Sequence, residues 1–408
     1  MEINYDRILL EKSHDFNTTV KTLEIVCDFV KSKKLIMVGG QAIDSALRLK
    51  GSALYQSEES ADYDCWSPDP YGHGQELGAL LCEAGLPNVS IIYGMHLTTT
   101  CVRVDFTSMV DMSYCPQNVF DNLPYLEYRG FRIIHPHAQM IDQHRSRSYP
   151  YEMLNMGGMV GFRWAKDTER HDLLYDYYPI LISSKDKPTT SNPISINISM
   201  LDNLCIAGYG AYDIYMDAHK IDKKGSKIKF RSSLQIMTDT FEETVQKFAK
   251  YTSITPKYFN AFMGRLPRSA SLGDITIYDN YNSMVAANKL NLNLDSDDKT
   301  YDVYYVCGQH VLMYFLHKGD YGNYVIMKLK ETPLIITTYG KKTLHESQEL
   351  SFASFDDTKL KSKMVPKRLY PKPGECNIFA EFDYNSSKYF QIDGKECKLQ
   401  SDYHLNIN

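Results

Sequence analysis

The spacing of apolar residues predicts alternating helices and strands over the first part of the chain. Residues 5–33 carry apolar side chains three or four positions apart, which is the period of a helix with one buried face. The run 33–40, KKLIMVGG, has the apolar centre of a buried strand and ends in a glycine turn, and 41–49 continue as an amphipathic helix. Residues 61–67 predict a short strand, which a turn connects to a helix within 67–85.

Alternating apolar and polar residues then indicate strands. Residues 89–95 and 98–110 are two such runs, and the segment 94–98 between them predicts a hairpin. A further strand is expected at 131–136, before two helices. These helices span about 137–147 and 160–177.

A polar stretch with two prolines, 183–193, predicts a linker between two domains. We therefore expect a first domain over 1–182, which includes the N-terminal helix, and a second over 194–408. The second domain begins with a predicted long helix, 194–216, followed by a basic loop at 219–231. Its strands are expected at 233–239, 275–280, 324–329 and 334–340.

The composition is that of a soluble globular protein in a reducing compartment. Apolar residues make up 43% and charged residues 23%, and a net charge of −5 leaves nucleic-acid contacts to local basic patches. The nine cysteines include no CxxC pair, which argues against a zinc ribbon or a disulfide framework. The N-terminus is too charged for a signal peptide, and the most apolar run, 303–316, is too short to span a bilayer. We expect a cytoplasmic protein without a membrane anchor.

Three carboxylates and a glycine turn form the sharpest chemical signal. Asp62 and Asp64 are two residues apart on a predicted strand, so their side chains share one face. Asp105 lies in a later alternating run and is expected to complete a cluster. Such a cluster repels itself unless cations neutralise it, and two Mg²⁺ (or Mn²⁺) ions held this way serve phosphoryl transfer. Gly39 and Gly40 open a helix, where backbone amides can receive a phosphate.

Each part of this pattern also has a structural interpretation. Asp62 and Asp64 occur in a sequence typical of a solvated turn, and Asp105 is the kind of residue that caps or pairs locally. We favour the functional interpretation because all the parts occur in order, on suitable elements, within one compact stretch. His135, His137 and His144 have no carboxylate or cysteine at metal-binding spacing, so we expect no zinc site there.

These motifs resemble the nucleotidyltransferase superfamily of DNA polymerase β and the poly(A) polymerases. The segments SADYDCWSPDPYGHGQELGALL, LPYLEYRGFRIIHPHAQMIDQHRSRS and GFRWAKDTERHDLLYDYYP are similar to the poly(A) polymerase catalytic subunits of large cytoplasmic DNA viruses, both giant-virus and poxvirus types. The resemblance covers most of residues 35–330. It implies a mixed α/β fold, with a polymerase β-like lobe followed by a degenerate copy of it.

The resemblance also implies a template-independent adenylyltransferase that adds AMP from ATP to the 3′ end of single-stranded RNA. Asp62, Asp64 and Asp105 would hold both ions, and Gly39 and Gly40 would receive the triphosphate. Relatives act as homodimers or with a separate processivity subunit, and a viral protein would be located in the host cytoplasm or the virion. The second lobe fits a degenerate copy, because Gly208 precedes a helix as Gly39 does, whereas the following strand holds only Asp239.

Basic residues supply the candidate contacts to phosphate. Arg163 and Lys166, on a predicted helix, can face a triphosphate or RNA, although a solvated helix face is an equal alternative. Two lysine-rich stretches, within 219–231 and 359–372, favour RNA contact. Two other functions remain open: a nucleotidyltransferase acting on a small molecule or making a nucleotide second messenger, and a catalytically silent RNA-binding subunit. The basic stretches argue against the first and the carboxylates against the second.

Overall fold

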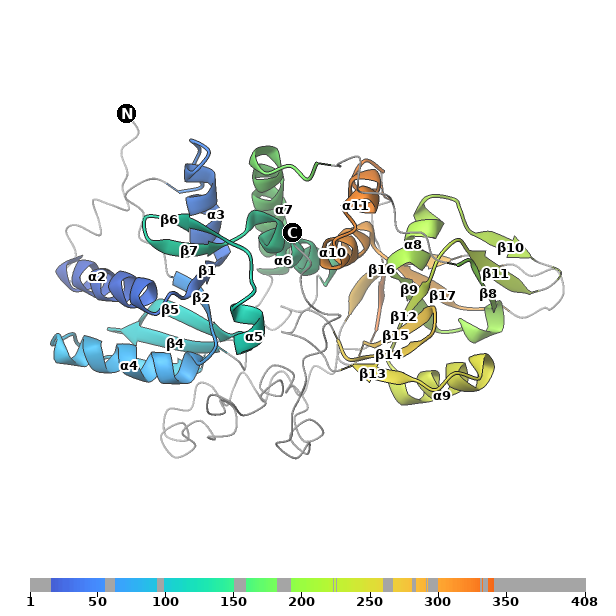
Figure 1. Ribbon diagram of the computed structural model, residues 1–408, viewed down its shortest axis with the longest axis horizontal. Coiled ribbons are helices and arrows are strands. Elements are labelled where there is room, and N and C mark those ends of the chain that lie inside the picture. Colours follow the sequence, from blue (N-terminus) through green and yellow to red (C-terminus); the bar gives the residue numbers. More distant parts are fainter. Residues whose placement is uncertain are drawn as a thin grey trace. The chain divides into compact units, whose positions relative to one another are not determined.

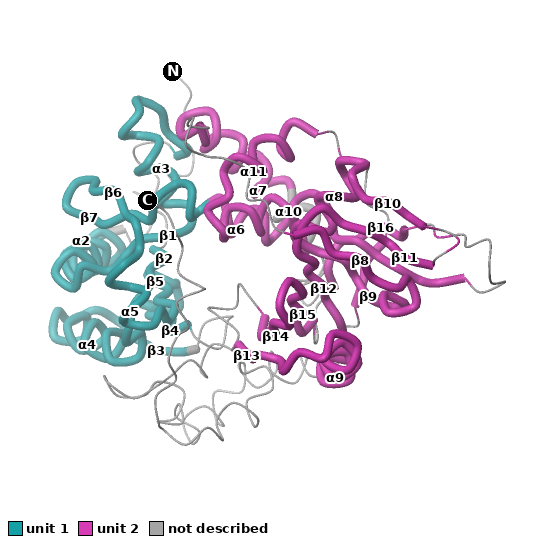
Figure 2. The backbone as a smooth tube through the Cα atoms, turned by 45° about the vertical axis from the view of Figure 1, so that its right-hand side comes forward, with its two compact units in different colours: residues 1–139, 351–398 teal, residues 140–350, 399–408 magenta. Residues whose placement is uncertain are grey.

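The structure is a computed structural model, and its described residues form two compact units (Figure 2). The first unit ends at Gln139 and the second begins at Met140. The described residues are 16–55, 63–93, 99–149, 159–181, 192–222, 224, 226–259, 267–280, 284–290, 292, 300–330, 332 and 337–340.

The first unit is a seven-stranded mixed sheet with helices packed against it. The strand order is β3-β4-β5-β2-β1-β7-β6, and α2 and α4 lie side by side against the sheet (Figure 1). In chain order the elements are α2 (Phe16–Ser32), β1 (Ile36–Val38), α3 (Gly39–Arg48), β2 (Tyr63–Ser67), α4 (Pro70–Glu83), β3 (Ser90–Tyr93), β4 (Thr99–Val104), β5 (Thr107–Tyr114), α5 (Gln117–Phe120), β6 (Tyr125–Tyr128), β7 (Phe131–Ile134) and α6 (Pro136–Ser148).

One edge of this sheet gathers the elements that carry the predicted chemistry. Strand β2 is antiparallel to β1 and parallel to β5, so β1 ends at the same edge at which β2 and β5 begin. Strand β7 is parallel to β1 and also ends there, and α6 follows it directly. We call this the carboxylate edge, because Asp62 precedes β2 and Asp64 is the second residue of β2.

The second unit contains an eight-stranded sheet, β13-β14-β15-β12-β9-β17-β16-β18, and a three-stranded sheet, β10-β11-β8. Its elements are α7 (Met159–Tyr177), β8 (Ile194–Asn197), the 3₁₀ turn Ile198–Met200, β9 (Leu204–Ala207), α8 (Gly208–Tyr215), β10 (Lys220–Asp222), β11 (Lys227–Phe230), β12 (Leu234–Thr238), α9 (Phe241–Thr252), β13 (Lys257–Phe259), β14 (Ser269–Leu272), β15 (Ile275–Asp279), β16 (Val285–Leu290), β17 (Val303–Val306), α10 (Gly308–Lys318), α11 (Tyr321–Lys328) and β18 (Thr337–Tyr339).

The large sheet of the second unit repeats the strand order of the first. Strand β9 leads into α8 and pairs antiparallel with β12, as β1 leads into α3 and pairs antiparallel with β2. Strand β12 is parallel to β15, as β2 is parallel to β5. Strand β9 is parallel to β17, as β1 is parallel to β7. The expected mixed fold with a second copy of the first lobe is therefore confirmed in its topology.

Four sequence-based predictions of secondary structure are wrong. The predicted basic loop at 219–231 instead forms the two strands β10 and β11. The segment 194–216 is not one helix: its first residues alternate as β8, Asn203 turns the chain with a φ of 56°, and only α8 is helical. Residues 324–328 of the predicted strand 324–329 lie in α11, where Tyr324 and Met327 are buried and Ile326 is exposed, as on a helix with one buried face. The run 98–110 is interrupted by a turn, so β5 begins at Thr107.

The division into units differs from the predicted domain boundary at 183–193. Helix α6 crosses from one unit to the other and contacts α10 and α11 through His144. Helix α7 groups with the second unit, where His171 contacts Tyr324 of α11. The boundary between the domains as predicted stays a prediction, since most of 183–193 lies outside the described residues. The N-terminal fifteen residues and the basic stretch within 341–408 also lie outside them.

Buried apolar side chains form a core beneath each sheet, including Ile36, Leu47 and Val110 in the first unit and Ile206, Phe230 and Ile236 in the second. The apolar run 303–316 is divided between β17 and α10, and both are largely buried, as expected. Among the described residues, no helix combines the length and the apolar character needed to cross a membrane.

Candidate active site

Gly39 is the residue at which helix α3 begins and which the Asp64 carboxylate approaches. It begins α3 with a φ of 68°, a left-handed conformation that glycine adopts without strain. A Cβ at this position would lie 2.3 Å from Oδ2 of Asp64, so only glycine allows this carboxylate to approach the helix start. Asp64 lies next to Gly39 because it pairs with Val38, the residue before Gly39, across strands β1 and β2. The Gly39 amide donates to Oε1 of Gln139 on α6 at 3.2 Å, a partner that the sequence analysis missed.

Asp111 is the carboxylate that the structure places beside Asp64. The two residues are register partners on the parallel strands β2 and β5, so their side chains emerge on the same face. Both are half-buried. Cys101, on β4, is the register partner of Asp111 on the other side, and burial together with a hydrogen bond to Asp111 raises the pKa of its thiol to about 11.

Asp105 does not lie on a strand, which corrects the predicted placement. It occupies the turn between β4 and β5 with a φ of 48°, and its Oδ1 accepts from Nδ2 of Asn88 at 2.8 Å. Six residues separate it from Asp111 along the chain. Its run of alternating residues looked like one strand because the turn contains neither glycine nor proline. The Asp105 side chain therefore pairs locally, as the structural interpretation proposed.

Asp62 lies outside the described residues. Within the described ranges no three His, Cys, Asp or Glu side chains gather closely enough to hold a metal ion. The Asp64–Asp111 pair nevertheless suits a divalent cation, because carboxylate oxygens are the ligands that Mg²⁺ accepts and like charges this close favour a counter-ion. Asp62 lies two residues before Asp64 in the sequence, and its role as a ligand stays a prediction.

The corresponding position of the second unit has lost its carboxylates. Ala207 pairs with Gln235 as Val38 pairs with Asp64, and Gln235 pairs with Thr276 as Asp64 pairs with Asp111. A glycine with a φ of 52° again starts the helix, where a Cβ would lie 2.4 Å from Oε1 of Gln235. This is Gly208, which was expected to match Gly39.

Register therefore places the lost carboxylates at Gln235 and Thr276, not at the predicted Asp239. Gln235 accepts from the Tyr209 amide at 2.8 Å and is buried. Asp239 lies beyond the end of β12 and accepts from Asn280, and Asp279 pairs with Arg268. A neutral amide and a hydroxyl cannot replace carboxylates as ligands of two metal ions. The second unit is a degenerate copy in its site as well as in its fold.

The predicted phosphate-binding residues of α7 belong to the second unit. Lys166 is half-buried, and the side chain of Arg163 lies outside the described residues. Gly40 is the second residue of α3. The roles of these residues stay predictions.

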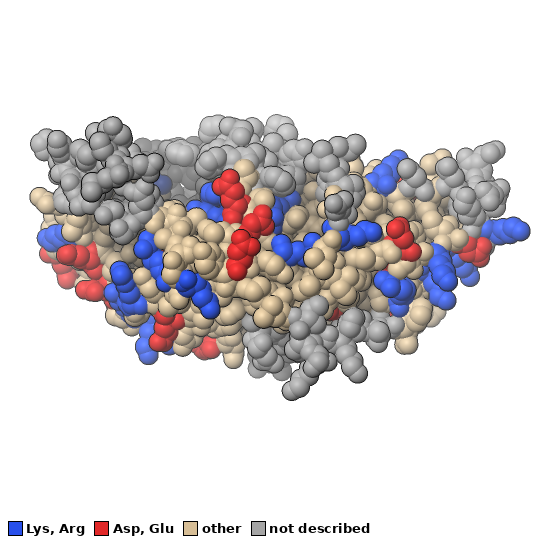
Figure 3. All heavy atoms as spheres, turned by 90° about the horizontal axis from the view of Figure 1, so that it is seen from above, with Lys and Arg blue, Asp and Glu red and all other residues tan. Residues whose placement is uncertain are grey.

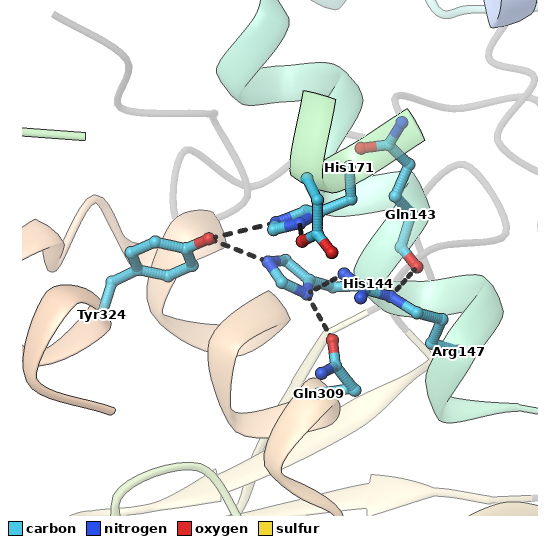
Figure 4. Close-up of polar contacts among 7 residues, drawn as sticks. Gln143, His144, Arg147, His171, Gln309 and Tyr324 are labelled. Atoms are coloured by element: carbon cyan, nitrogen blue, oxygen red, sulfur yellow. Dashed lines mark hydrogen bonds and ion pairs between the residues drawn. The ribbon is translucent and has the colours of Figure 1, made fainter. Parts of the chain in front are cut away.

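A buried polar network in the second unit was not foreseen from the sequence (Figure 4). His144 of α6 and His171 of α7 both contact the hydroxyl of Tyr324, at 3.0 and 3.4 Å. Nη2 of Arg147 lies 3.1 Å from Nδ1 of His144, and Gln309 lies 2.8 Å from the same nitrogen. All but Gln309 are at least nine-tenths buried.

Both histidines of this network are held neutral. Burial is the main cause, with the neighbouring Arg147 charge second for His171, whose pKa falls to about 3. The pKa of His144 is lowered well below its usual 6.5, again first by burial and then by His171 and Arg147. A neutral His144 with its proton on Nδ1 donates to Oε1 of Gln309 and accepts from the Tyr324 hydroxyl at Nε2, so both ring nitrogens have partners without a second proton.

We expect the second unit to lose stability as the pH falls below about 6.5. The unfolded chain binds protons at these histidines at a pH where the folded chain does not, so stability is retained above the unfolded pKa and lost during acidification. The loss at pH 5 is on the order of 1–2 kcal/mol for each histidine. Denaturant unfolding at pH 7, 6 and 5 measures it through Trp164 fluorescence in a Trp66→Phe background, which removes the other of the two tryptophans.

In the same series, His144→Gln should flatten the pH dependence, because glutamine keeps hydrogen-bonding capacity but does not titrate. The control His219→Gln, outside the network, should leave the slope unchanged. A slope that is identical in parent and His144→Gln would contradict the assignment.

The strand order, the glycine helix start and the carboxylate pair are consistent with a nucleotidyltransferase fold of the polymerase β type, followed by a degenerate copy. The particular likeness is to viral poly(A) polymerases: residues 24–153 match the family model described as Poly(A) polymerase catalytic subunit. This range includes Gly39, Asp64, Asp111 and Gln139, and it confirms the resemblance stated from the sequence.

Viral proteins are among the relatives. A protein of African swine fever virus named "Putative poly(A) polymerase catalytic subunit" is 37% identical over 190 residues, which are 47% of this chain and 39% of that protein. A mimivirus protein of the same name is 22% identical over 357 residues, or 81% of this chain and 56% of that protein. The chain thus spans less than two thirds of either relative.

The likeness in fold extends over nearly the whole chain. The crystal structure of the Megavirus polyadenylate synthase superposes with a TM-score of 0.61 at 19% identity, covering 93% of this chain and 76% of that one. At this identity the superposition shows a shared fold.

Proposed function

We propose that this protein is a poly(A) polymerase catalytic subunit, which transfers AMP from ATP to the 3′ end of RNA. The observation that carries the proposal is the Asp64–Asp111 pair facing the glycine start of α3, within the stretch that matches the family model. Paired carboxylates beside a helix N-terminus suit a reaction in which a triphosphate and a divalent cation must be held together.

In this proposal Asp62, Asp64 and Asp111 hold the divalent cations, Mg²⁺ or Mn²⁺. Bound there, the cations would lower the pKa of the attacking 3′ hydroxyl and offset the charge of the leaving pyrophosphate. Asp111 takes the role that the sequence analysis gave to Asp105, because register places Asp111 and not Asp105 beside Asp64. The 3′ oxygen forms a bond to the α-phosphorus of ATP as the bond to pyrophosphate breaks.

The triphosphate is proposed to lie against the start of α3, where no side chain of the preceding residue caps the helix. Backbone amides there point outward and the helix dipole favours negative charge. Gly40, within the first turn, leaves this end open to a phosphate, whereas Gly39 makes room for Asp64. Arg163 and Lys166 of α7 are proposed as additional phosphate ligands.

One assay tests this function against its rivals. Purified protein is incubated with a short single-stranded RNA, each of the four nucleoside triphosphates in turn, and Mg²⁺ or Mn²⁺. An extension ladder with ATP supports the proposal. A labelled product that forms without RNA supports a small-molecule or second-messenger nucleotidyltransferase, and the absence of product in every reaction supports a silent RNA-binding subunit.

We also propose that RNA contacts the exposed face of the three-stranded sheet. Lys220, Lys227 and Lys229 alternate with buried residues on β10 and β11, and Lys220 pairs with Lys229 across the strands. Asp222, opposite Lys227, is the acidic exception. Figure 3 shows several Lys and Arg side chains at the end of the view where Figure 1 places these strands. We call the three residues the lysine face; Lys223, also predicted to contact RNA, lies outside the described residues.

Replacing the three residues of the lysine face with Gln should weaken RNA binding and flatten its salt dependence. Each lost phosphate contact lowers the log–log slope by about 0.7 for a single strand, so the triple variant should lose about 2. Fluorescence anisotropy of a labelled oligonucleotide over a salt series measures both quantities. The matched control changes three exposed lysines elsewhere, Lys34, Lys250 and Lys257, to Gln. Equal slope changes in both variants would exclude a specific RNA contact at the lysine face.

A further inference from the structure

The turn between β4 and β5 carries a strained, exposed aromatic residue. Val104 and Thr107 are paired, so the connection is the two-residue loop Asp105–Phe106. Both residues have positive φ, 48° and 64°, as the tight turns of twisted hairpins require. Aspartate tolerates this conformation, but glycine is the usual second residue, and phenylalanine is an outlier there. The Phe106 side chain is 79% exposed, so packing against its own unit does not account for it.

A second hairpin of the same sheet provides a comparison. Tyr128 and Phe131 are paired across the two-residue loop Arg129–Gly130, whose φ values are 49° and 83°. This turn has the same form and carries glycine in the position that Phe106 occupies. An aromatic side chain at Phe106 is therefore not a requirement of the turn, and strained residues of this kind tend to occur at functional sites.

The two hairpins lie at opposite edges of the sheet. Strand β5 begins at the carboxylate edge, so Phe106, just before it, lies at that edge. Strand β7 ends at the carboxylate edge, so Arg129, just before β7, lies at the far edge. The five residues from Phe106 to Asp111 span about 16 Å of strand, which equals roughly five nucleotides of a stacked strand at about 3.4 Å each.

Polar side chains connect the carboxylate pair to the hairpin. Oγ of Ser108 donates to Oδ1 of Asp111 at 3.2 Å and lies 3.2 Å from Sγ of Cys101. Ser108 is the register partner of Arg103, after a bulge in β4. The buried Nε of Arg103 has no hydrogen-bond partner among the described residues. A half-buried cation thus lies along the strands between Phe106 and Asp111, and its side chain also contacts Cys101.

We propose that the β4–β5 hairpin holds the RNA strand near its 3′ end, with Phe106 stacked on a base and Arg103 donating to a phosphate. The inference rests on the proposed function and adds the residues that would position the RNA. An exposed aromatic ring beside a cation is the combination that single-stranded nucleic acids recognise. The distance from Asp111 places the stacked base within about five nucleotides of the reacting end.

The test separates strain from binding. Phe106→Gly should raise the melting temperature, because Asp–Gly suits this turn, and should weaken RNA binding or raise the KM for RNA by about 5- to 100-fold. The KM for ATP should change little. Phe106→Trp should restore RNA binding, since indole also stacks. Arg103→Gln should lower the salt slope of RNA binding by about 0.7, whereas the far-edge control Arg129→Gln should not.

A set of oligonucleotides locates the stacked base. Each carries one abasic position among the last six nucleotides, and affinity is measured in EDTA. One abasic position should weaken binding to the parent protein but not to Phe106→Gly. If Phe106→Gly binds all the oligonucleotides as the parent does, the inference is wrong even when ATP-dependent extension occurs. If the parent binds RNA through Phe106 but extends nothing, the proposed function fails and the binding site stands.

Discussion

Asp64→Asn and Asp111→Asn should each abolish RNA extension, whereas Asp105→Asn should retain it. Register places Asp64 and Asp111 side by side. In the proposed mechanism, removing either carboxylate removes a ligand of the cations that activate the 3′ hydroxyl and offset the charge of the leaving pyrophosphate. We expect a loss of about 1,000-fold or more, equivalent to about 4 kcal/mol of activation free energy. Single-turnover extension with saturating ATP and RNA measures it. Asp105 pairs with Asn88 in a turn, so its replacement should cost less than tenfold.

The melting temperatures of the same variants distinguish a loss of catalysis from a loss of folding. Without divalent cations, Asp64→Asn and Asp111→Asn should melt at or above the parent temperature, because each removes a like charge. Asp239→Asn is the control, since Asp239 is an aspartate of the second unit that accepts from Asn280 beyond the end of β12, away from the position that matches Asp64. If Asp111→Asn extends RNA at a rate near that of the parent, or Asp105→Asn shows a large loss, then Asp105 and not Asp111 is the third metal ligand.

Gly39→Ala should lose most activity, for a reason that differs from the loss of a ligand. The added Cβ would lie 2.3 Å from Oδ2 of Asp64, at a φ that L-residues rarely adopt. Either the helix start or the carboxylate must move, and a displacement of about 1 Å can reduce a rate about 100-fold. Activity, metal dependence and melting temperature are measured together.

The second copy supplies the control. Gly208→Ala brings a Cβ within 2.4 Å of Oε1 of Gln235, at a φ of 52°, so it should cause a similar loss of stability. It should leave the chemical step nearly unchanged, because Gln235 replaces a carboxylate. If the two alanine variants lose activity equally, the effect of Gly39→Ala arises from stability and not from the position of Asp64.

The spacing of apolar residues predicted the helices and strands of the first unit well, because each of them shows the period of a helix or a strand. The buried strand before Gly39, the amphipathic helix after it and the strand of Asp64 all form as expected. The pattern failed where two elements shared one apolar run. The segment 194–216 holds the short strand β8, a turn at Asn203 and the strand β9 before α8. Strand β9 is buried on both faces and shows no alternation, so its apolar run merges with that of α8 and resembles one long helix.

A turn hidden within one apolar run also explains why Asp105 was predicted in the site in place of Asp111. Gly39 and Asp64 follow from spacing, but Asp105 lies within the predicted run 98–110 and Asp111 directly follows it, and only the turn decides which of them lies beside Asp64. A turn made of aspartate and phenylalanine has no glycine to mark it. Gln139 and the histidine network depend on contacts between distant segments, which spacing does not encode.

The exchange of carboxylate for amide at Gln235 separates two properties that the first unit combines. In the proposed site of the first unit, Asp64 and Asp111 repel each other unless a cation offsets their charge. In the second unit the neutral oxygen of Gln235 accepts from the Tyr209 amide, so the same position needs no counter-ion. The exchange that removes the proposed metal ligand therefore also removes the need for a metal ion. We expect chelation of divalent cations to lower the stability of the first unit and to leave that of the second unit unchanged.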